Sequence, residues 1–357
     1  MSILITGGAG YIGSHAVQRM LRDGHTVVAV DNLVRGHVEA IERLQDHAHG
    51  RLHFYNADVG DSGRIHQIIT SHAVTSVLHF AALAYVGESV TQPLRYYRTN
   101  TAATLGLVEA IHRSSGHVDR LVFSSTCATY GDPPPQFIPI PETCPQAPIN
   151  PYGASKLFSE RILFDYAAGL RASQSKTPFA FAALRYFNVA GCDQSGILGE
   201  HHEPETHLVP VVLQAALGQR DGIAVFGADY PTPDGTCIRD YVYVEDLIDA
   251  HAAVLDALRP GDTRTYNLGI GKGYSVREVI ESARRVTGRT IAVSEAPRRA
   301  GDPPRLFADP RKIQQELGWR ARMTDIDQIV GTAWKWMQSN PNGYSSESKR
   351  KQQGHQD

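Results

Sequence analysis

Short runs of apolar residues alternate with amphipathic stretches through the first half of the chain. The apolar runs are rich in β-branched and aromatic residues and only a few residues long, as is typical of buried strands. They predict strands at 2–6, 26–31, 51–58, 76–82 and 120–125, with one further strand at 179–188. Strands that alternate with helices in this way predict an α/β protein with a doubly wound, Rossmann-type parallel sheet.

The second half of the chain has a different residue pattern, with longer predicted loops that are rich in Gly, Pro, His and Asp. We therefore expect residues 1–187 to form a Rossmann domain, to which the chain returns at about 236–262. Residues 188–338 are expected to form mainly a second, smaller α/β region that faces the substrate. The last residues, 339–357, have almost no aliphatic side chains, so this tail is predicted to be disordered.

Composition and charge narrow the classes of function. Hydrophobic residues make up 42% of the chain and the formal net charge is −2, which argues against a nucleic-acid surface. No apolar run is long enough to span a bilayer, and the N-terminus lacks the basic start of a signal peptide. The cysteines show no CxxC spacing, so neither a disulfide framework nor a zinc knuckle is indicated. We expect a cytoplasmic protein with no membrane or nucleic-acid partner.

A glycine-rich turn follows the first predicted strand and precedes a helix. Residues 5–14 read ITGGAGYIGS, with Gly7, Gly10 and Gly13 spaced as GxxGxxG. Such glycines permit a tight turn, a close approach to a diphosphate and close helix–strand packing, and the helix start favours the diphosphate charge. Asp31 ends the second predicted strand, where a carboxylate accepts hydrogen bonds from ribose hydroxyls and repels a 2′-phosphate. The pattern therefore favours NAD over NADP.

Further residues near this turn have candidate roles. Asp58 follows the third predicted strand and is placed to hold the adenine amino group. The small residues of the run 80–82 end the fourth strand and would let the backbone approach a cofactor. Arg35 could favour a 2′-phosphate instead, but we interpret it as an exposed loop residue.

A tyrosine and a lysine stand four residues apart in NPYGASK, at residues 150–156. Pro151 suits the first turn of a helix, so Tyr152 and Lys156 are expected to share one helix face. A lysine ammonium there would lower the pKa of the tyrosine and make it a general base. The hydroxyl groups of residues 124–126 end the fifth predicted strand, at the edge of the sheet where ligands bind in such folds.

Three motifs resemble those of the extended short-chain dehydrogenase/reductases, namely GGAGYIG (7–13), SSTCATYG (124–131) and PYGASK (151–156). The resemblance is narrowed to the UDP-glucose 4-epimerase type by RYFNVAG, ETHLVPVVLQAALG, GADYPTPDGTCIRDYVYVEDLIDAH and RRAGDPP. It implies a tightly bound NAD, a UDP-sugar substrate and a homodimer. It also implies reversible inversion at the sugar C4, from UDP-galactose to UDP-glucose, through a 4-keto intermediate.

The resemblance implies roles for individual residues, with Tyr152 as the base, Lys156 as the cofactor-holding lysine and Thr126 on the sugar O4. The implied cofactor-binding residues are Gly7, Gly10, Tyr11, Ile12, Gly13, Asp31, Asn32, Asp58, Val59, Phe80, Ala81, Ala82, Asn100, Ser124, Tyr152, Lys156 and Tyr186. The implied substrate-binding residues are Thr126, Asn188, His207, Leu208, Phe226, Arg239, Arg299, Asp302 and Leu306.

Several alternatives stay open at this stage. Leu306 stands where glucose-specific members often carry a tyrosine, so UDP-N-acetylglucosamine is one alternative substrate. Similarity to plant-type UDP-arabinose 4-epimerases makes UDP-xylose and UDP-arabinose another. Cys127 and Ala128 replace the Asp-Glu pair of the dehydratases, so water elimination is not expected. A non-catalytic NAD-sensing protein is a remote alternative, which the presence of Tyr152 and Lys156 disfavours.

Three histidines, His201, His202 and His207, are close together in the first long loop of the expected second region. Their spacing does not match HExxH, so we expect no metal site here.

Overall fold

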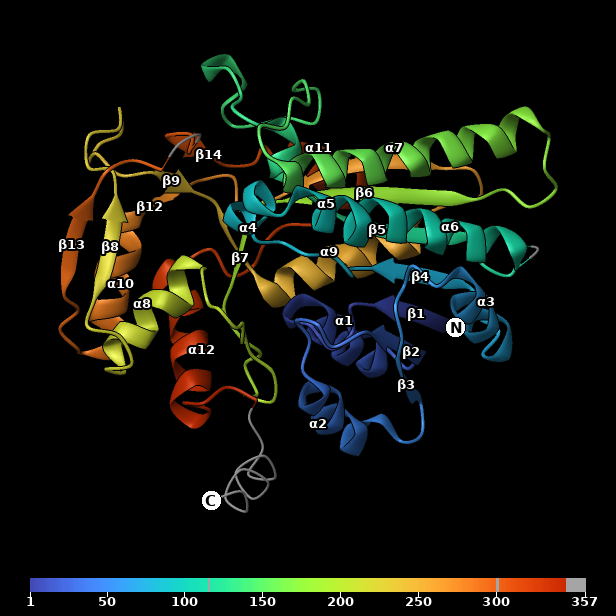
Figure 1. Ribbon diagram of the computed structural model, residues 1–357, viewed down its shortest axis with the longest axis horizontal. Coiled ribbons are helices and arrows are strands. Elements are labelled where there is room, and N and C mark those ends of the chain that lie inside the picture. The colour runs from blue at the N-terminus through green and yellow to red at the C-terminus, as the bar shows by residue number, and fades with distance from the viewer. Residues whose placement is uncertain (115, 300–301, 345–357) are drawn as a thin grey trace.

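A seven-stranded parallel sheet forms the centre of the computed structural model, which describes residues 1–114, 116–299 and 302–344 (Figure 1). The strand order is β11-β6-β5-β4-β1-β2-β3, so the predicted doubly wound sheet is confirmed. Its strands are β1 (Ser2–Thr6), β2 (Thr26–Asp31), β3 (Leu52–Asn56), β4 (Ser76–His79), β5 (Arg120–Thr126), β6 (Ala180–Tyr186) and β11 (Thr263–Leu268). The seventh strand, β11, was not predicted and begins just after the expected return segment at 236–262.

Helices cover both faces of this sheet. They are α1 (Tyr11–Arg22), α2 (Val38–Ala48), α3 (Ser62–Ser71), α6 (Ala103–Arg113), α7 (Pro151–Ala172) and α9 (Val244–Ala257). Side chains alternate along β1, so Ile3 and Ile5 join a core with residues of α1 and α9, whereas Leu4 joins the core on the α3 and α6 side. No helix within the described ranges is both long and apolar enough to cross a membrane.

Short helical segments link the larger elements near the edge of the sheet. They are α4 (Val86–Thr91), α5 (Pro93–Tyr96), the π-helix η1 (Tyr97–Ala102) and the 3-10 helices η2 (Cys127–Tyr130) and η3 (Pro135–Phe137).

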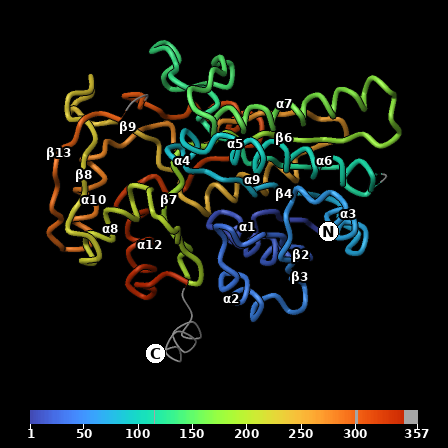
Figure 2. Tube along the Cα trace, viewed as in Figure 1, coloured from blue at the N-terminus to red at the C-terminus, as the bar shows by residue number. Residues whose placement is uncertain are grey.

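The second region packs beside the large sheet, on the side where its strands end and away from the N-terminus (Figure 2). It contains three small sheets, β10-β7, β12-β9-β14 and β13-β8, and the helices α8, α10 and α12 pack on one another. Its elements are β7 (Asn188–Ala190), α8 (Leu208–Ala216), β8 (Ile223–Phe226), β9 (Ile238–Arg239), β10 (Tyr241–Tyr243), β12 (Tyr274–Ser275), α10 (Val276–Thr287), β13 (Val293–Ala296), β14 (Arg305–Leu306) and α12 (Ile326–Ser339). The helix α11 (Arg311–Leu317) comes from the same part of the chain but packs on β11 and α9 of the large sheet.

The first residues of the expected disordered tail are ordered, which corrects that expectation. Ser339 is the last residue of α12, and Tyr344 is only 3% exposed. The Tyr344 hydroxyl accepts from the backbone N–H of Gly199 at 2.8 Å, and the Arg43 guanidinium lies 4.9 Å from the ring centroid. A single aromatic side chain thus holds this segment although its composition is polar. Residues 345–357 lie outside the described residues.

Candidate functional site

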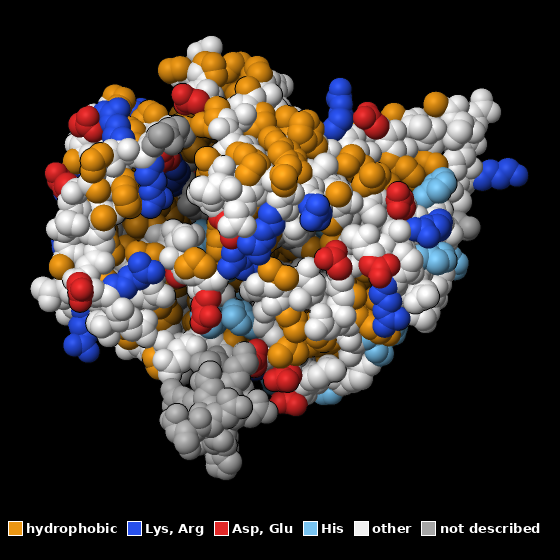
Figure 3. Space-filling model, viewed as in Figure 1, with side chains coloured by type: hydrophobic (Ala, Val, Ile, Leu, Met, Phe, Trp, Pro, Cys, Tyr) orange, Lys and Arg blue, Asp and Glu red, His pale blue; other side chains and the backbone are white. Residues whose placement is uncertain are grey.

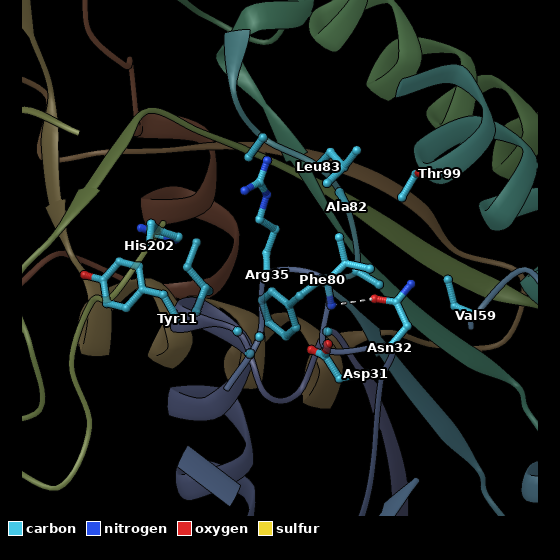
Figure 4. A pocket seen from close by; sticks show the side chains of 18 of the residues that line it. Tyr11, Asp31, Asn32, Arg35, Val59, Phe80, Ala82, Leu83, Thr99 and His202 are labelled. Carbon is cyan, nitrogen blue, oxygen red and sulfur yellow. Dashed lines mark hydrogen bonds between the residues drawn. The ribbon is translucent and has the colours of Figure 1, made fainter. Parts of the chain in front are cut away.

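A pocket of about 360 Å³ opens at the carboxyl ends of β1, β2 and β4 (Figure 4). This is the point where strand order reverses, because β1 lies between β4 and β2 and the chain continues outward on both sides. Ligands bind at such switch points in open α/β sheets. The sequence-predicted residues that line it are Gly7, Gly10, Tyr11, Ile12, Gly13, Asp31, Asn32, Asp58, Val59, Phe80, Ala81, Ala82, Tyr152, Lys156, Tyr186 and His207.

The glycine turn between β1 and α1 forms the floor of this pocket. Gly7 has a φ of +71°, and a Cβ there would lie 2.7 Å from the backbone nitrogen of Ala81. A Cβ on Gly13 would collide with the carbonyl oxygen of Gly7. Gly10 begins α1 without a side-chain cap, so the first N–H groups of the helix have no side-chain partner from the cap residue. The turn can therefore accept an anion at close range.

Three polar side chains at the ends of β2 and β3 line one wall of the pocket, namely Asp31, Asn32 and Asp58. The Asp31 carboxylate is buried and accepts from the N–H groups of Ala9 at 3.1 Å and Leu33 at 2.8 Å. Burial raises the pKa of Asp31, and these hydrogen bonds oppose the shift. The Asn32 amide donates to the Asp58 carboxylate at 3.2 Å, which brings the second and third polar groups together.

Arg35 is not the exposed loop residue that we expected. Its guanidinium donates to the Glu88 carboxylate at 2.9 Å and to the Glu203 carbonyl at 2.6 Å. It also lies 4.6 Å from the centroid of the Tyr85 ring, and the side chain lines the pocket (Figure 4). Residues distant in sequence hold Arg35 in place, and no local pattern indicates such contacts.

The segment Asn150–Lys156 begins α7, as predicted. The Asn150 side chain caps the helix by accepting from the Gly153 N–H at 2.8 Å, and Pro151 is the first helical residue. Tyr152 and Lys156 are both buried and line the same pocket as the glycine turn. The Lys156 ammonium lies 4.6 Å from the Phe123 ring centroid. Burial lowers the pKa of Lys156 to about 7, although the nearby Glu160 opposes the shift.

The pKa of Tyr152 differs from the sequence expectation. Burial raises it well above the ordinary value of a phenol, and the charge of Tyr186 adds to the rise, whereas hydrogen bonding with Thr126 lowers it. We expected the Lys156 ammonium to lower this pKa, but the cost of burying the phenolate outweighs such an effect here.

Asn100 and Ser124, two of the predicted cofactor residues, support the pocket from behind instead of lining it. The Asn100 amide accepts from the Leu83 N–H at 2.8 Å and donates to the Leu83 carbonyl at 3.0 Å, which fixes the loop after β4. The Ser124 hydroxyl accepts from the Tyr186 hydroxyl at 3.1 Å and lies 3.2 Å from Nε2 of His251. Both residues therefore position side chains or backbone that do line the pocket.

The remaining predicted substrate residues lie outside this pocket, in and near the second region. Arg239 forms an ion pair with Asp302, and the register of β14 on β9 places Leu306 opposite Arg239. Leu306 also packs in an apolar cluster with Cys127, so this group lies next to η2, which Thr126 caps. Burial raises the pKa of the Cys127 thiol to about 12 and the Arg239 charge opposes this rise, in agreement with this proximity.

A second group of predicted substrate residues is centred on β8. The Arg299 guanidinium lies 4.0 Å from the centroid of the Phe226 ring. Asn188 begins β7, and Leu208 begins α8 directly after His207. The structure therefore joins Phe226 with Arg299 and Arg239 with Asp302, but these four residues do not line the pocket beside β1.

Sequence reasoning missed part of the pocket lining. The lining residues that were not predicted for this pocket are Val30, Val34, Arg35, Gly36, Ala57, Leu83, Ala84, Arg95, Thr99, Val189, Glu200 and His202. Several of these residues come directly after predicted residues at the ends of strands. They would have been included if more residues after each predicted strand had been considered as candidates. Arg95, Thr99 and Glu200 come from distant segments, for which the sequence carried no signal.

Comparisons with known proteins agree with this geometry. The family described as GDP-mannose 4,6 dehydratase matches residues 4–332. The chain is 46% identical over 353 residues to a UDP-glucose 4-epimerase of Halalkalibacterium halodurans, covering 99% of this chain and 100% of the relative. It is 45% identical to a protein of Oryza sativa subsp. japonica named probable UDP-arabinose 4-epimerase 3, covering 96% of this chain and 84% of the relative. A crystal structure of UDP-glucose 4-epimerase from Bifidobacterium longum in complex with NAD+ and UDP matches with a TM-score of 0.89 at 38% identity, covering 96% of this chain and 100% of that chain.

Proposed function

The chain belongs to the GDP-mannose 4,6-dehydratase family, among its UDP-glucose 4-epimerases, and we propose that it reversibly inverts the sugar C4 of UDP-galactose and UDP-glucose. It is an isomerase of galactose metabolism that uses NAD. The observation that carries the proposal is that Tyr152 and Lys156 face the same pocket as the glycine turn. The proposed proton acceptor, Tyr152, and the glycine turn proposed to bind the dinucleotide therefore line one pocket, at the point where the strand order reverses.

The chain's own residues fit NAD. The turn at Gly7 leaves no room for a Cβ, and the start of α1 offers N–H groups to a diphosphate. We assign Asp31 to the adenosine ribose, and we assign Asn32 and Asp58, which line the same pocket and hydrogen-bond each other, to the adenine end. When bound, NAD supplies a reversible acceptor for the hydride of the sugar C4.

Tyr152 is the proposed general base. As the phenolate it takes the proton of the sugar 4-OH, and as the resulting phenol it returns a proton to O4 after the 4-keto sugar has presented its other face. Thr126 is proposed to hold O4, and it hydrogen-bonds the phenol. The Lys156 ammonium is proposed to favour the phenolate against the cost of its burial. Because η2 carries Cys127 and Ala128 and no carboxylate, these positions provide no acid–base pair for water elimination.

The second region is proposed to bind the UDP moiety, while the Rossmann domain holds NAD. Arg239 and Arg299 suit the diphosphate, since a guanidinium is planar and always charged. Asp302 is proposed for the uridine ribose and Phe226 for the uracil. Asn188, together with His207 and Leu208 at the start of α8, is proposed to contact the rest of the substrate.

A UDP-arabinose 4-epimerase is the second candidate. The rice relative is 45% identical to this chain, almost as similar as the relative from Halalkalibacterium halodurans. Leu306 is smaller than a tyrosine, which also leaves room for a 2-acetamido sugar. One side chain in a pocket typically changes discrimination by only about 1–3 kcal/mol, so fold and mechanism would be the same for all three sugars.

We further propose a cytoplasmic homodimer that forms through the helices around η1 and α7. Large apolar side chains are exposed on these neighbouring elements, among them Val90, Leu94, Leu105 and Phe158. Tyr97 and Phe158 join η1 to α7 with ring centroids 5.9 Å apart. Figure 3 shows hydrophobic side chains gathered on the face over α5 and α7. An apolar patch of this kind is typical of a protein–protein interface.

The experiment that tests the function uses purified protein with no added NAD. UDP-galactose, UDP-N-acetylgalactosamine and UDP-arabinose are offered separately, and their 4-epimers are followed by chromatography. We expect turnover of UDP-galactose together with NAD recovered from the denatured protein. Turnover of the pentose alone would replace the proposed substrate with UDP-arabinose. No turnover of any sugar would refute the epimerase and, if NAD were still recovered, would favour the NAD-sensing alternative.

A further inference from the structure

Four side chains converge in the loop between β7 and α8, beside the cofactor pocket. Glu200, His202, Glu205 and His207 each contribute one donor atom, and these four atoms all lie within 4.8 Å of one another. Three of the four side chains also line the pocket. The HExxH search of the sequence could not reveal this set, because its spacing is Glu-x-His-x-x-Glu-x-His.

The distances within the cluster match a tetrahedral metal site. Nδ1 of His202 lies 3.4 Å from a Glu200 oxygen and 3.3 Å from a Glu205 oxygen. Nδ1 of His207 lies 3.1 Å from the same Glu200 oxygen and 3.0 Å from the other Glu205 oxygen. Four ligands at about 2.0–2.2 Å from a central zinc ion are separated from one another by about 3.3–3.6 Å. The four His–Glu separations agree with this value to within a few tenths of an ångström, and all the donor atoms lie within 4.8 Å of one another.

Directed hydrogen bonds explain this arrangement less well. Each Nδ1 is almost equidistant from two carboxylates, whereas one N–H can point well at only one acceptor. Glu200 is 7% exposed and Glu205 is 9% exposed, so two carboxylates are held close together away from water. In the neutral form that metal ligation requires, the two imidazoles together with the two carboxylates carry a charge of −2, which one divalent cation balances.

The surroundings hold the donor groups in place. One Glu205 oxygen accepts from the N–H groups of Thr206 and His207, both at 2.8 Å, which fixes the carboxylate. The Tyr85 ring lies 6.0 Å from the His202 ring and 6.2 Å from the His207 ring, between centroids. Its hydroxyl is buried and has no hydrogen-bond partner within the described part of the chain. The Tyr85 hydroxyl is therefore a buried oxygen without a hydrogen-bond partner among the described residues, on a ring that packs against the two histidines of the cluster.

We propose that Glu200, His202, Glu205 and His207 bind one divalent cation, with Zn²⁺ as the ion that suits a tetrahedral set of two imidazoles and two carboxylates. All four positions are taken by protein side chains, so the site is structural and not catalytic. It fixes the loop that Arg35 and His37 contact through the carbonyls of Glu203 and His201. The ion thereby holds one wall of the cofactor pocket without touching the reacting atoms.

The test uses the full chain, purified without a polyhistidine tag, stripped with a chelator and titrated with Co²⁺ alone. Tetrahedral Co²⁺ has a strong visible absorption band, and Zn²⁺ should then displace it. We expect one Co²⁺ per wild-type chain, and loss of the band in His202→Gln and in Glu200→Gln. His201→Gln is the matched control, because His201 is the next residue but stacks on His37 at 4.4 Å and accepts from the Tyr344 N–H. It should bind Co²⁺ like the wild type.

Circular dichroism of each stripped variant checks that the fold is kept. The absence of the band in the folded wild-type protein would overturn the proposal, and this result does not depend on any variant. Equal binding by wild type, His202→Gln and Glu200→Gln would overturn it as well. Because the measurement reads absorption and not turnover, it is independent of the proposed epimerase activity.

Discussion

The Tyr152 phenol is the side chain on which the proposed chemistry depends most directly. Tyr152→Phe keeps the ring, which packs against Tyr96 with centroids 6.4 Å apart, but removes the proton-accepting oxygen. Because a general base typically contributes about 10²–10⁴-fold, we expect turnover of UDP-galactose to fall by at least about 100-fold while NAD stays bound. The measurement is steady-state turnover together with the NAD content of the denatured protein. Tyr97→Phe, on η1, is the control that should turn over normally, and turnover at the wild-type rate in Tyr152→Phe would exclude this base.

Asp240 gives a pH-dependent prediction for stability. The carboxyl group is fully buried and accepts from the N–H groups of Ile270 at 2.9 Å and Ala308 at 3.2 Å. Burial raises its pKa to about 7, above the value of about 4 in an unfolded chain. Between these pH values the folded protein keeps a proton that the unfolded chain releases, so the free energy of unfolding falls as pH rises.

Asp240→Asn removes this titration, so its melting temperature relative to wild type should increase from about pH 5 to about pH 8. Thermal unfolding of both proteins across this range is the measurement. A difference in melting temperature that is constant with pH, or that decreases, would show that the carboxyl is not protonated in the folded state.

Two glycines of α7 offer a matched comparison at the scale of the element. A Cβ on Gly153 would collide with the carbonyl oxygen of Ala128 in η2, whereas a Cβ on Gly169 would meet open space. Gly169→Ala should stabilise the protein by about 0.5–1 kcal/mol, since glycine costs backbone entropy within a helix. Gly153→Ala should instead destabilise it by about 1–3 kcal/mol through overpacking. Urea unfolding measures both, and a stabilising Gly153→Ala would contradict the close contact between α7 and η2.

The exposed apolar face over α5 and α7 gives a prediction for the whole molecule. Leu94 is 79% exposed and Phe158 is 50% exposed, although both are large apolar side chains. If this face joins two chains, Leu94→Asp combined with Phe158→Asp should convert a dimer into a monomer in sedimentation velocity. Val293→Asp, on β13 with 39% exposure, is the control that should remain dimeric. A wild-type protein that sediments as a monomer would refute the dimer.

Much of the site was predictable because its signals are local. The turn at Gly7, the carboxylate at the end of β2 and the pair Tyr152–Lys156 each depend on a few neighbouring residues whose types fix the backbone conformation. Asn100 was also singled out, but its place behind the Leu83 loop depends on contacts with Ser155 and with Leu83 itself. Its supporting position could not be inferred from spacing alone.

The sequence by itself determined six of the seven strands of the Rossmann sheet, the dinucleotide turn and the helix that carries Tyr152 and Lys156. These features follow from hydrophobic periodicity and from backbone preferences that act over a few residues. Only the tertiary structure decided that Arg35 reaches Glu88, that Tyr344 is held by Gly199, and that two histidines and two glutamates face one centre. Such contacts depend on which distant segments lie side by side and on where their side chains point. No local pattern of residues along the chain indicates either.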